Sequence, residues 1–283
     1  MPLPAATPTL SPTSVSVLTA LLEARTGQQL ASYRSWRIDT ALKPLLRERS
    51  LDSFDDLVLL LLNGGDHAIG DEIVDALVNQ ETSFFREAPV FDMIMEAVAA
   101  AEAEGRRARV WSAGCATGQE PLSLAMLFAE RQDETGAAPP EIVASDVSES
   151  TIIRARTGHF NQFEIQRGLP IRRALRWFDN TPGGDWVAKP ELLRMVQFRR
   201  LNLVSPDWSV GKFDVVLCRN VLLYLSPAIK VGVFNRLAAS LRPEGVLVLG
   251  AGETVIGQTR AFEPSKRFRG FYQPRDPASS AAG

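Results

Sequence analysis

The stretch Arg109-Val-Trp-Ser-Ala-Gly-Cys-Ala-Thr-Gly-Gln-Glu-Pro-Leu-Ser-Leu-Ala-Met126 has the pattern of a short strand, a glycine turn and a helix. Gly114 and Gly118 interrupt the chain after the apolar run, and Pro121 stands where the first turn of a helix tolerates proline. Glycines let a backbone approach a ligand closely, and the start of the following helix presents free N–H groups to it. The stretch therefore indicates the first turn of a nucleotide-binding α/β fold. The alternative is a tight structural turn without a ligand.

The spacing of the two glycines narrows the class of ligand. Gly114 and Gly118 are separated by three residues, whereas the dinucleotide fingerprint is Gly-x-Gly-x-x-Gly. This difference argues against NAD and favours another ligand that carries adenosine.

Two further apolar stretches run into polar residues, as buried parallel strands do at a ligand site. One ends at Asp146, whose carboxylate can accept hydrogen bonds from ribose hydroxyls, and the other begins at Lys212 and runs out into Asn220. Ligands of open α/β sheets bind at the carboxyl ends of strands, where these two residues and Gly114 are expected to meet. The alternative for Asp146 is an N-cap of the helix that begins near Ser148.

These stretches and others, in the same order, resemble the CheR family, the S-adenosylmethionine-dependent methyltransferases that esterify glutamates of bacterial chemoreceptors. The resemblance covers the chain from about residue 30 to residue 273. The motifs that carry it are Asn79-Gln-Glu-Thr-Ser-Phe-Phe-Arg-Glu87, Trp111-Ser-Ala-Gly-Cys-Ala-Thr-Gly-Gln-Glu-Pro121, Ala144-Ser-Asp-Val147, Phe163-Glu-Ile-Gln-Arg-Gly-Leu-Pro170, Phe213-Asp-Val-Val-Leu-Cys-Arg-Asn-Val-Leu-Leu-Tyr224 and Gly250-Ala-Gly-Glu253.

The resemblance implies an α/β protein: a small all-helical N-terminal domain followed by a Rossmann-like seven-stranded methyltransferase domain with an inserted small antiparallel β subdomain. We place the helical domain at 13–85, the methyltransferase domain at 86–275 and the β subdomain at about 158–198. The flanking residues 1–12 and 276–283 are rich in Pro, Ala and Ser, and we expect disordered tails there.

Local patterns add detail to this outline. Apolar residues recur at helical spacing between residues 15 and 78, where we expect four helices, the third of them capped by Ser53. The run from Leu192 to Phe198 is strand-like and is assigned to the β subdomain. Phe262 and residues 268–272 are expected to form a closing antiparallel strand.

The resemblance assigns the cofactor S-adenosylmethionine, with S-adenosylhomocysteine as product, to residues spread over these motifs. The expected cofactor-binding residues are Gln80, Thr82, Arg86, Gly114, Glu120, Asp146, Asn202, Leu203, Asn220 and Val221. Arg86 would be costly to bury without an anionic partner, and guanidinium matches the methionine carboxylate in a bidentate way. The family's asparagine usually stands two residues before Thr82, where this chain has Gln80, with Asn79 one position earlier. For Asn202 a plain turn asparagine is the alternative.

The reaction that the resemblance implies needs alignment more than acid–base chemistry. A glutamate carboxylate has a pKa of about 4.3 and is already ionised at pH 7, so it needs no strong base to attack the sulfonium methyl. The residues expected to act at the reacting atoms are Arg86, Arg219 and Tyr224. Tyr224 could donate a hydrogen bond to one oxygen of the acceptor; the alternative is aromatic core packing.

The expected partner is the cytoplasmic helical bundle of chemoreceptors. The helix from Tyr33 to Arg49 is basic within a slightly acidic protein, and relatives use such a helix against the acidic receptor. The residues expected to make this contact are Arg34, Arg37, Lys43 and Arg47, and the β subdomain is a second candidate contact. The alternative is an ordinary solvated face.

Composition excludes several other classes. The formal net charge of −2 gives no general attraction to nucleic acid or acidic membranes. We interpret Cys115 and Cys218 as small buried residues of a reducing compartment, and the spacing of His67 and His159 predicts no metal site. No apolar run reaches the roughly 18 residues that span a membrane, and no signal-peptide pattern is present, so we expect a cytoplasmic protein with a monomer as the default. The family resemblance implies a bacterial protein.

Three rival functions remain on sequence grounds. A nucleic-acid amino-methyltransferase carries an Asp/Asn-Pro-Pro-aromatic turn, whereas this chain has Asn220-Val-Leu-Leu-Tyr224. A small-molecule methyltransferase shares the cofactor half but does not explain the basic helical domain. The third is a non-catalytic cofactor sensor or scaffold. A pure scaffold would have no need of the residues that the resemblance assigns to the site, which are Thr82, Arg86, Glu120, Asp146 and Asn220.

Overall fold

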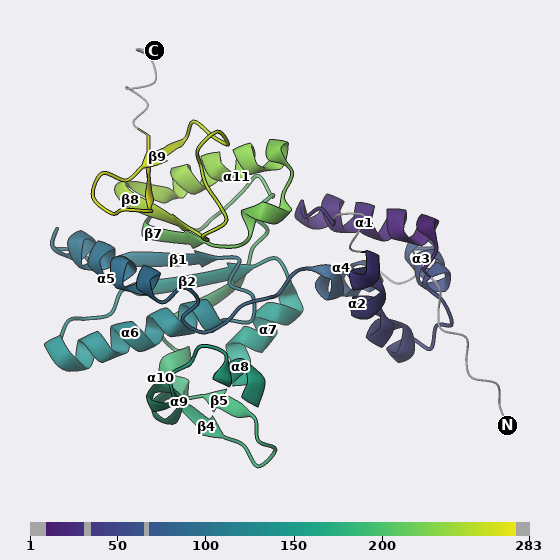
Figure 1. Cartoon of the computed structure of the whole chain (residues 1–283), viewed down its shortest axis with the longest axis horizontal. Helices are drawn as coiled ribbons and strands as arrows, with labels where there is room; N and C mark the ends of the chain where they lie inside the picture. Colours follow the sequence, from purple (N-terminus) through teal and green to yellow (C-terminus); the bar gives the residue numbers. More distant parts are fainter. Residues whose placement is uncertain (1–9, 31–34, 65–67, 276–283) are drawn as a thin grey trace. The chain divides into compact units, whose positions relative to one another are not determined.

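The computed structural model describes residues 10–30, 35–64 and 68–275 (Figure 1). Residues 1–9 of the tail expected at 1–12, the tail expected at 276–283, Arg34 and His67 lie outside the described residues. Ser11 and Pro12 differ from the expectation, since Ser11 is the N-cap of the first helix and Pro12 begins it. The chain divides into two compact units, one made of Met1–Asn79 with Tyr224–Ser226, the other of Gln80–Leu223 with Pro227–Gly283.

The first unit is helical in its described part, as predicted. It contains α1 (Pro12–Thr26), α2 (Ser35–Glu48), α3 (Phe54–Leu62) and α4 (Ile69–Leu77). Serine hydroxyls cap the N-termini of α1 and α3. Ser11 accepts a hydrogen bond from the Ser14 amide (3.1 Å), and Ser53 accepts one from the Asp56 amide (3.1 Å). The apolar faces meet in a small core that contains Leu18, Leu22, Ile38, Leu42, Phe54 and Ile73.

The second unit is built on a seven-stranded sheet with the order β6-β2-β1-β7-β8-β10-β9. The strands are β1 (Arg109–Ala113), β2 (Glu141–Asp146), β6 (Val196–Arg200), β7 (Phe213–Cys218), β8 (Leu241–Leu249), β9 (Phe262–Pro264) and β10 (Tyr272–Pro274). The first five in the sheet order are parallel, and β10 is antiparallel to β8 and β9. The Rossmann-like methyltransferase fold is therefore confirmed. Its closing antiparallel pair is β9 and β10, which include Phe262 and Tyr272 of the expected residues but not residues 268–271.

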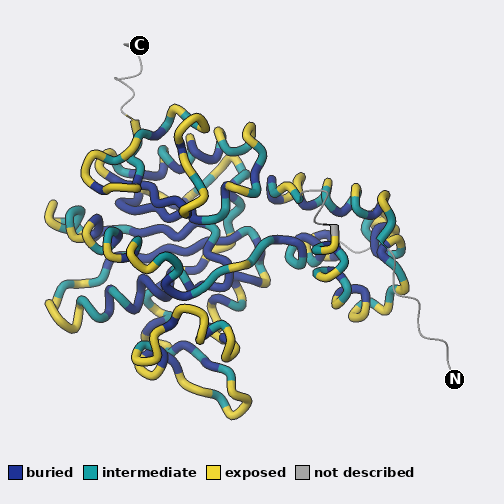
Figure 2. The backbone as a smooth tube through the Cα atoms, viewed as in Figure 1, coloured by how far each residue is buried: buried dark blue, intermediate teal, exposed yellow. Residues whose placement is uncertain are grey.

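Helices cover the sheet and explain why its central strands β1, β2 and β7 are buried along almost their whole length. Helix α5 (Pro89–Glu102) packs on β7 and β8, α6 (Gln119–Thr135) and α7 (Glu149–Thr157) pack on β2 and β6, and α11 (Pro227–Ser240) packs on β8. Every residue of β7 is buried, and the central strands form the buried middle of the unit (Figure 2). Burial on both faces is the rule for parallel sheets flanked by helices.

The inserted subdomain is a small antiparallel sheet with the order β3-β5-β4, accompanied by three short helices. Its elements are β3 (His159–Phe160), α8 (Gln162–Gln166), α9 (Ile171–Trp177), β4 (Phe178–Asn180), β5 (Trp186–Ala188) and α10 (Pro190–Leu193). The assignment of its last residues differs from the prediction. Leu192 lies in α10, and Val196 and Phe198 lie in β6, which pairs with β2 of the main sheet. The alternating pattern showed a strand but not its partner, because pairing is set by tertiary contacts.

An ion pair across β1 and β2 makes the stability of the sheet dependent on pH. The carboxylate of Glu141 accepts hydrogen bonds from Arg109 at Nε (2.8 Å) and Nη2 (3.0 Å), which lowers the pKa of Glu141 in spite of its partial burial. A lowered folded-state pKa stabilises the protein above the unfolded pKa of about 4.3, and this contribution is lost as pH falls through the folded pKa.

We therefore expect Glu141→Gln to lower the free energy of unfolding more at pH 7 than at pH 3, measured by urea denaturation at both values. Glu134→Gln is the matched control, because Glu134 is exposed on α6 and makes no ion pair with any described residue. Equal losses at both pH values for Glu141→Gln would contradict the role of the pair.

Candidate active site at the carboxyl ends of the strands

The structure brings most of the predicted residues to one edge of the sheet. Gly114 follows β1, Asp146 ends β2, Asn202 follows β6 and Asn220 follows β7, and these four strands are adjacent and parallel. The carboxyl ends of adjacent parallel strands lie at the same edge, so four segments that are distant in sequence converge there.

The glycine turn is packed too closely for any other residue. Gly114 has a φ of 81°, and a Cβ at this position would lie 2.4 Å from Cγ2 of Val221. The amides of Gly114 and Cys115 both donate to the carbonyl of Ser145 (2.8 and 2.9 Å). The turn after β1 is therefore fixed against the end of β2 and against Val221, which follows β7, and only glycine fits at position 114.

Asp146, next to Ser145, holds the same turn through its side chain. The residue is 8% exposed, and its carboxylate accepts hydrogen bonds from the amides of Ala116 (2.9 Å) and Ser148 (3.1 Å). The N-cap of α7 is Ser148, whose hydroxyl accepts from the Thr151 amide. Ser148, and not Asp146, is therefore the N-cap of α7, so the capping alternative for Asp146 is wrong. The ribose-binding role stays a prediction.

Arg219 is buried and connects three segments of the second unit through its guanidinium. Its side chain is 2% exposed, and its guanidinium contacts Glu120 (2.9 Å), Glu87 (2.9 Å) and the carbonyl of Arg86 (2.9 Å). The other oxygen of Glu120 accepts from the hydroxyl of Ser112 (2.7 Å). Burial alone lowers the pKa of Arg219, but the two carboxylates more than offset it, so the pKa is raised and the group stays charged. These contacts favour a positioning role for Arg219 over contact with a substrate.

Arg86 has the opposite character. It is half-buried, and its guanidinium forms no hydrogen bond or ion pair with any residue that the structure describes. A partly desolvated cation gains most from a carboxylate that accepts two parallel N–H bonds. The backbone of Arg86 is fixed by Arg219 while its side chain lacks a protein partner, which is what an anion-binding residue requires.

Backbone strain is concentrated around these residues. Among the described residues, the non-glycine residues with positive φ are Ser50 (54°), Phe85 (49°), Glu87 (61°), Ala116 (46°) and Asn220 (59°). All but Ser50 lie in or beside the candidate site. Such conformations cost about 1–3 kcal/mol each and persist where surrounding contacts impose them, typically at functional sites.

Glu253 holds the strained turn after β7 and was not predicted as a site residue. One carboxylate oxygen accepts from the amides of Asn220 (2.7 Å) and Gly250 (3.0 Å), and the other accepts from the amide of Leu223 (3.1 Å). Glu87 and Glu253 each end a motif of the family resemblance, so that signal was present in the sequence. Nothing in the local pattern revealed that they bind backbone or a buried arginine.

The remaining cofactor candidates have local roles in the structure. The side chain of Asn202 accepts from the amide of Val204 (3.1 Å), which is the contact of a turn asparagine, and the carbonyl of Leu203 accepts from Arg236 (2.9 Å). Gln80 and Thr82 are half-buried on the segment that leads to Arg86. Their contacts with a ligand stay predictions.

The candidates of the first unit are Tyr224 and the basic residues of α2. The hydroxyl of Tyr224 accepts a hydrogen bond from the amide group of Asn79, and Arg37 also donates to Asn79 (3.4 Å). Lys43 pairs with Asp39 one turn away on its own helix (2.5 Å), whereas Arg47 is exposed. The structure thus leaves Arg47 more available to a partner than Lys43.

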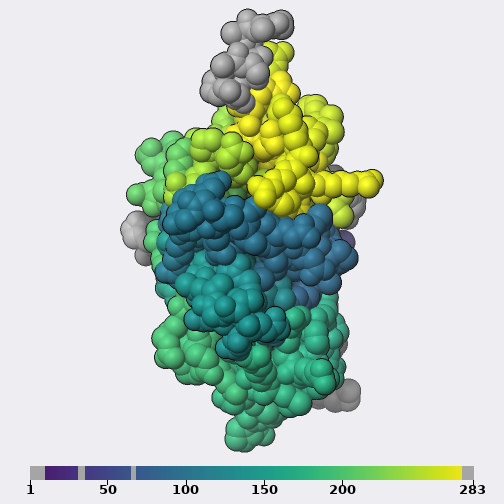
Figure 3. Space-filling model, turned by 90° about the vertical axis from the view of Figure 1, so that its left-hand side faces the viewer, coloured from purple at the N-terminus to yellow at the C-terminus, as the bar shows by residue number. Residues whose placement is uncertain are grey.

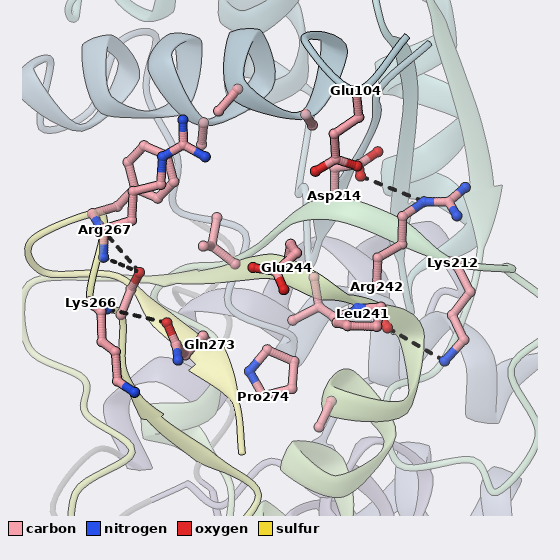
Figure 4. A pocket seen from close by; sticks show the side chains of 18 of the residues that line it. Glu104, Lys212, Asp214, Leu241, Arg242, Glu244, Lys266, Arg267, Gln273 and Pro274 are labelled. Atoms are coloured by element: carbon pink, nitrogen blue, oxygen red, sulfur yellow. Dashed lines mark hydrogen bonds and ion pairs between the residues drawn. The ribbon is translucent and has the colours of Figure 1, made fainter. Parts of the chain in front are cut away.

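A groove of about 1010 Å³ lies at the other ends of the strands (Figure 4). It runs between α5 and the C-terminal segment, which are neighbours on the surface (Figure 3). Asp214 at the start of β7 pairs there with Arg242 (3.5 Å), and Lys212 donates to the carbonyl of Leu241 (3.4 Å). No sequence-predicted site residue lines this groove. It is therefore separate from the candidate site.

Within residues 10–30, 35–64 and 68–275, no group of three His, Cys, Asp or Glu side chains is arranged to hold a metal ion. In the same ranges, no helix combines the length and apolarity that crossing a membrane requires.

Comparison with known proteins identifies relatives over most of the chain. Residues 80–271 match the family described as "CheR methyltransferase, SAM binding domain". The chain is 35% identical to chemotaxis protein methyltransferase 1 of Vibrio cholerae over 245 residues, 86% of this chain and 89% of that protein. It is 36% identical to chemotaxis protein methyltransferase 1 of Pseudomonas aeruginosa, with 83% and 87% of the two chains covered. For the chemotaxis protein methyltransferase of Salmonella typhimurium the identity is 31%, with 86% and 84% covered. The resemblance found in the sequence is confirmed.

The internal role of Arg219 predicts a large effect on stability. Arg219→Gln leaves two carboxylates without their cation, and we expect the free energy of unfolding to fall by about 3 kcal/mol in urea denaturation. Arg176→Gln is the matched control, because its pair with Asp133 is exposed and should contribute under about 1 kcal/mol. If the free energy of unfolding falls equally in the two variants, the buried ion pairs of Arg219 do not stabilise the protein as its contacts indicate.

Proposed function

The chain belongs to the CheR methyltransferase family, and on that premise we propose that it transfers methyl groups from S-adenosylmethionine to glutamate carboxylates of chemoreceptors. The products would be glutamate methyl esters that serve adaptation in chemotaxis or related signalling. The observation that carries the proposal is the half-buried guanidinium of Arg86, which has no partner among the described residues at the edge where Arg219 fixes its backbone.

The residues present fit this cofactor. Arg86 matches a carboxylate, Gly114 packs against Val221 at the end of β1 where only glycine fits, and Asp146 places a buried acid at the end of β2. We assign the methionyl end to Thr82 and Arg86, the ribose to Asp146 and the adenine border to Asn202 and Leu203, as the family resemblance implies. Gln80, Glu120, Asn220 and Val221 complete the proposed binding set. When bound, S-adenosylmethionine supplies an electrophilic methyl group on a sulfonium.

The proposed acceptor brings its own nucleophile. A glutamate side chain is ionised at pH 7, so the protein has to align it and exclude water, and alignment can contribute about 7–11 kcal/mol to the lowering of the barrier. A covalent route through a thiolate is not favoured. Burial raises the pKa of the Cys115 and Cys218 thiols well above the usual value, so neither forms a thiolate readily.

Tyr224 is the residue that we propose to orient the acceptor. Its hydroxyl oxygen accepts a hydrogen bond from Asn79, which leaves the phenolic proton for an acceptor elsewhere. Arg219, which the sequence suggested for the same task, acts through Glu87, Glu120 and the backbone of Arg86 instead.

The proposed partner is the cytoplasmic helical bundle of a receptor, which places the enzyme in the cytoplasm. We propose Arg37 and Arg47 of α2 for contact with its acidic surface, together with Arg34, which lies outside the described residues. Lys43 contributes less in this proposal, because Asp39 already neutralises it. Charge complementarity of this kind raises association rates more than it raises affinity.

Cofactor binding is tested by calorimetric titration with S-adenosylhomocysteine. We expect the wild type to bind and Arg86→Gln to weaken binding about 10- to 100-fold, because a charge-assisted bidentate contact is lost. Arg269→Gln is the control, since Arg269 is exposed and has no partner among the described residues. No binding by folded wild type would contradict the proposal.

The chemistry is tested with methyl-labelled S-adenosylmethionine and receptor cytoplasmic domains. We expect label on the receptor that mild base releases, as it does from a carboxyl ester, and a lower kcat for Tyr224→Phe with unchanged affinity for S-adenosylhomocysteine. Label that survives base would point to an amine acceptor. A Tyr224→Phe variant that loses only stability would assign the ring to packing.

A further inference from the structure

The inserted subdomain contacts the segment that carries Thr82 and Arg86. We define the insert as residues 158–195, since β6 begins at Val196, and the cofactor segment as residues 81–87. We propose that the insert is the anchor that holds the cofactor segment in its binding conformation. The assignment of a ligand to that segment rests on the proposed function, whereas the anchoring itself is independent of it.

An aromatic cluster forms the first contact. Phe84 is 1% exposed, and its ring meets those of Phe160 and Phe178 edge-on, at centroid distances of 5.1 and 5.6 Å. Phe160 and Phe178 belong to β3 and β4 of the insert and lie 6.0 Å from one another. Phe84 is thus the third ring of a cluster whose other members are in the insert, and edge-on pairs add specific geometry to apolar burial.

A glycine permits the second contact. Gly168 has a φ of 96°, and a Cβ at this position would lie 2.2 Å from the carbonyl oxygen of Phe84. That distance is impossible for a real side chain, so the backbones of the insert and the cofactor segment approach more closely than any residue but glycine allows.

Phe85 is held in its left-handed conformation from two directions. The guanidinium of Arg173, in α9 of the insert, lies 4.6 Å from the centroid of the Phe85 ring and is itself fixed by Glu130 of α6 (2.7 Å). The amide of Phe85 donates to the hydroxyl of Ser123 (3.1 Å). Helix α6 and the insert therefore fix Phe85 together.

An ion pair ties the start of the cofactor segment. Arg167 of the insert contacts Glu81 at 2.6 Å. The insert thus contacts the segment at Glu81, Phe84 and Phe85, directly before Arg86. Arg86 itself is fixed through its carbonyl by Arg219. The insert therefore holds the residues before Arg86, and Arg219 holds the backbone of Arg86 itself. A shift of either would displace the guanidinium of Arg86.

The first test compares two glycines of the insert. Gly168→Ala forces Cβ against the carbonyl of Phe84, whereas Gly184→Ala has a similar φ of 85° but open space around its Cβ. Both carry the backbone penalty of a left-handed alanine, so the pair isolates the contact with the cofactor segment. We expect Gly168→Ala to weaken S-adenosylhomocysteine binding about 10- to 100-fold and Gly184→Ala to leave it within about twofold of wild type.

The second test is milder and compares neighbouring arginines of α9. Arg173→Gln removes the cation above Phe85, whereas Arg172 is exposed and has no partner among the described residues. We expect Arg173→Gln, but not Arg172→Gln, to weaken the same binding several-fold. We also expect faster amide hydrogen exchange of residues 81–87 in the free Arg173→Gln protein, with unchanged exchange in the central strands.

The outcomes separate this inference from the proposed function. If wild type binds and Arg86→Gln does not, yet Gly168→Ala and Arg173→Gln bind as wild type with unchanged exchange, the anchoring role is wrong. If wild type fails to bind but Arg173→Gln still speeds amide exchange of residues 81–87, the anchor stands and the cofactor assignment fails. Should Gly168→Ala not fold, Arg173→Gln against Arg172→Gln decides alone.

Discussion

The candidate site depends on one buried cation. The guanidinium of Arg219 is almost without solvent contact, and the cost of burying a charge is recovered only because Glu87 and Glu120 face it. These partners come from the segment before α5 and from the start of α6, while Arg219 itself follows β7. Their convergence fixes the backbone of Arg86, whose side chain has no partner among the described residues.

The conformations around this cation are strained, and the protein offsets the strain locally. Phe85 and Asn220 have positive φ, which non-glycine residues adopt at a cost. The carboxylate of Glu253 accepts a hydrogen bond from the amide of Asn220, and the hydroxyl of Ser123 accepts one from the amide of Phe85. Ser123 belongs to α6 and Glu253 lies in the turn after β8, so contacts within the protein hold this edge of the sheet in place. Such preorganisation lowers the ordering cost of binding.

Sequence reasoning worked best where chemistry and local pattern coincide. The glycine turn, Asp146 and Asn220 were placed at one edge from strand patterns and from the rule for parallel sheets. The residues of β6 were predicted to belong to the insert, whereas β6 pairs with β2 of the main sheet. Alternation of apolar and polar residues predicts a strand but not the strand it pairs with. Sequence reasoning also proposed that Arg219 faces the substrate, since the sequence does not show which carboxylates surround a given arginine.

The sequence by itself determined the family, the α/β class and the order of the motifs, because these depend on residue types at fixed local spacing. The tertiary structure decided which polar groups are already bonded and which are not. Arg86 and Arg219 are chemically alike in the sequence, yet one is paired twice inside the protein and the other has no partner among the described residues. Only folding produces that difference, because burial and pairing bring together residues far apart in the chain.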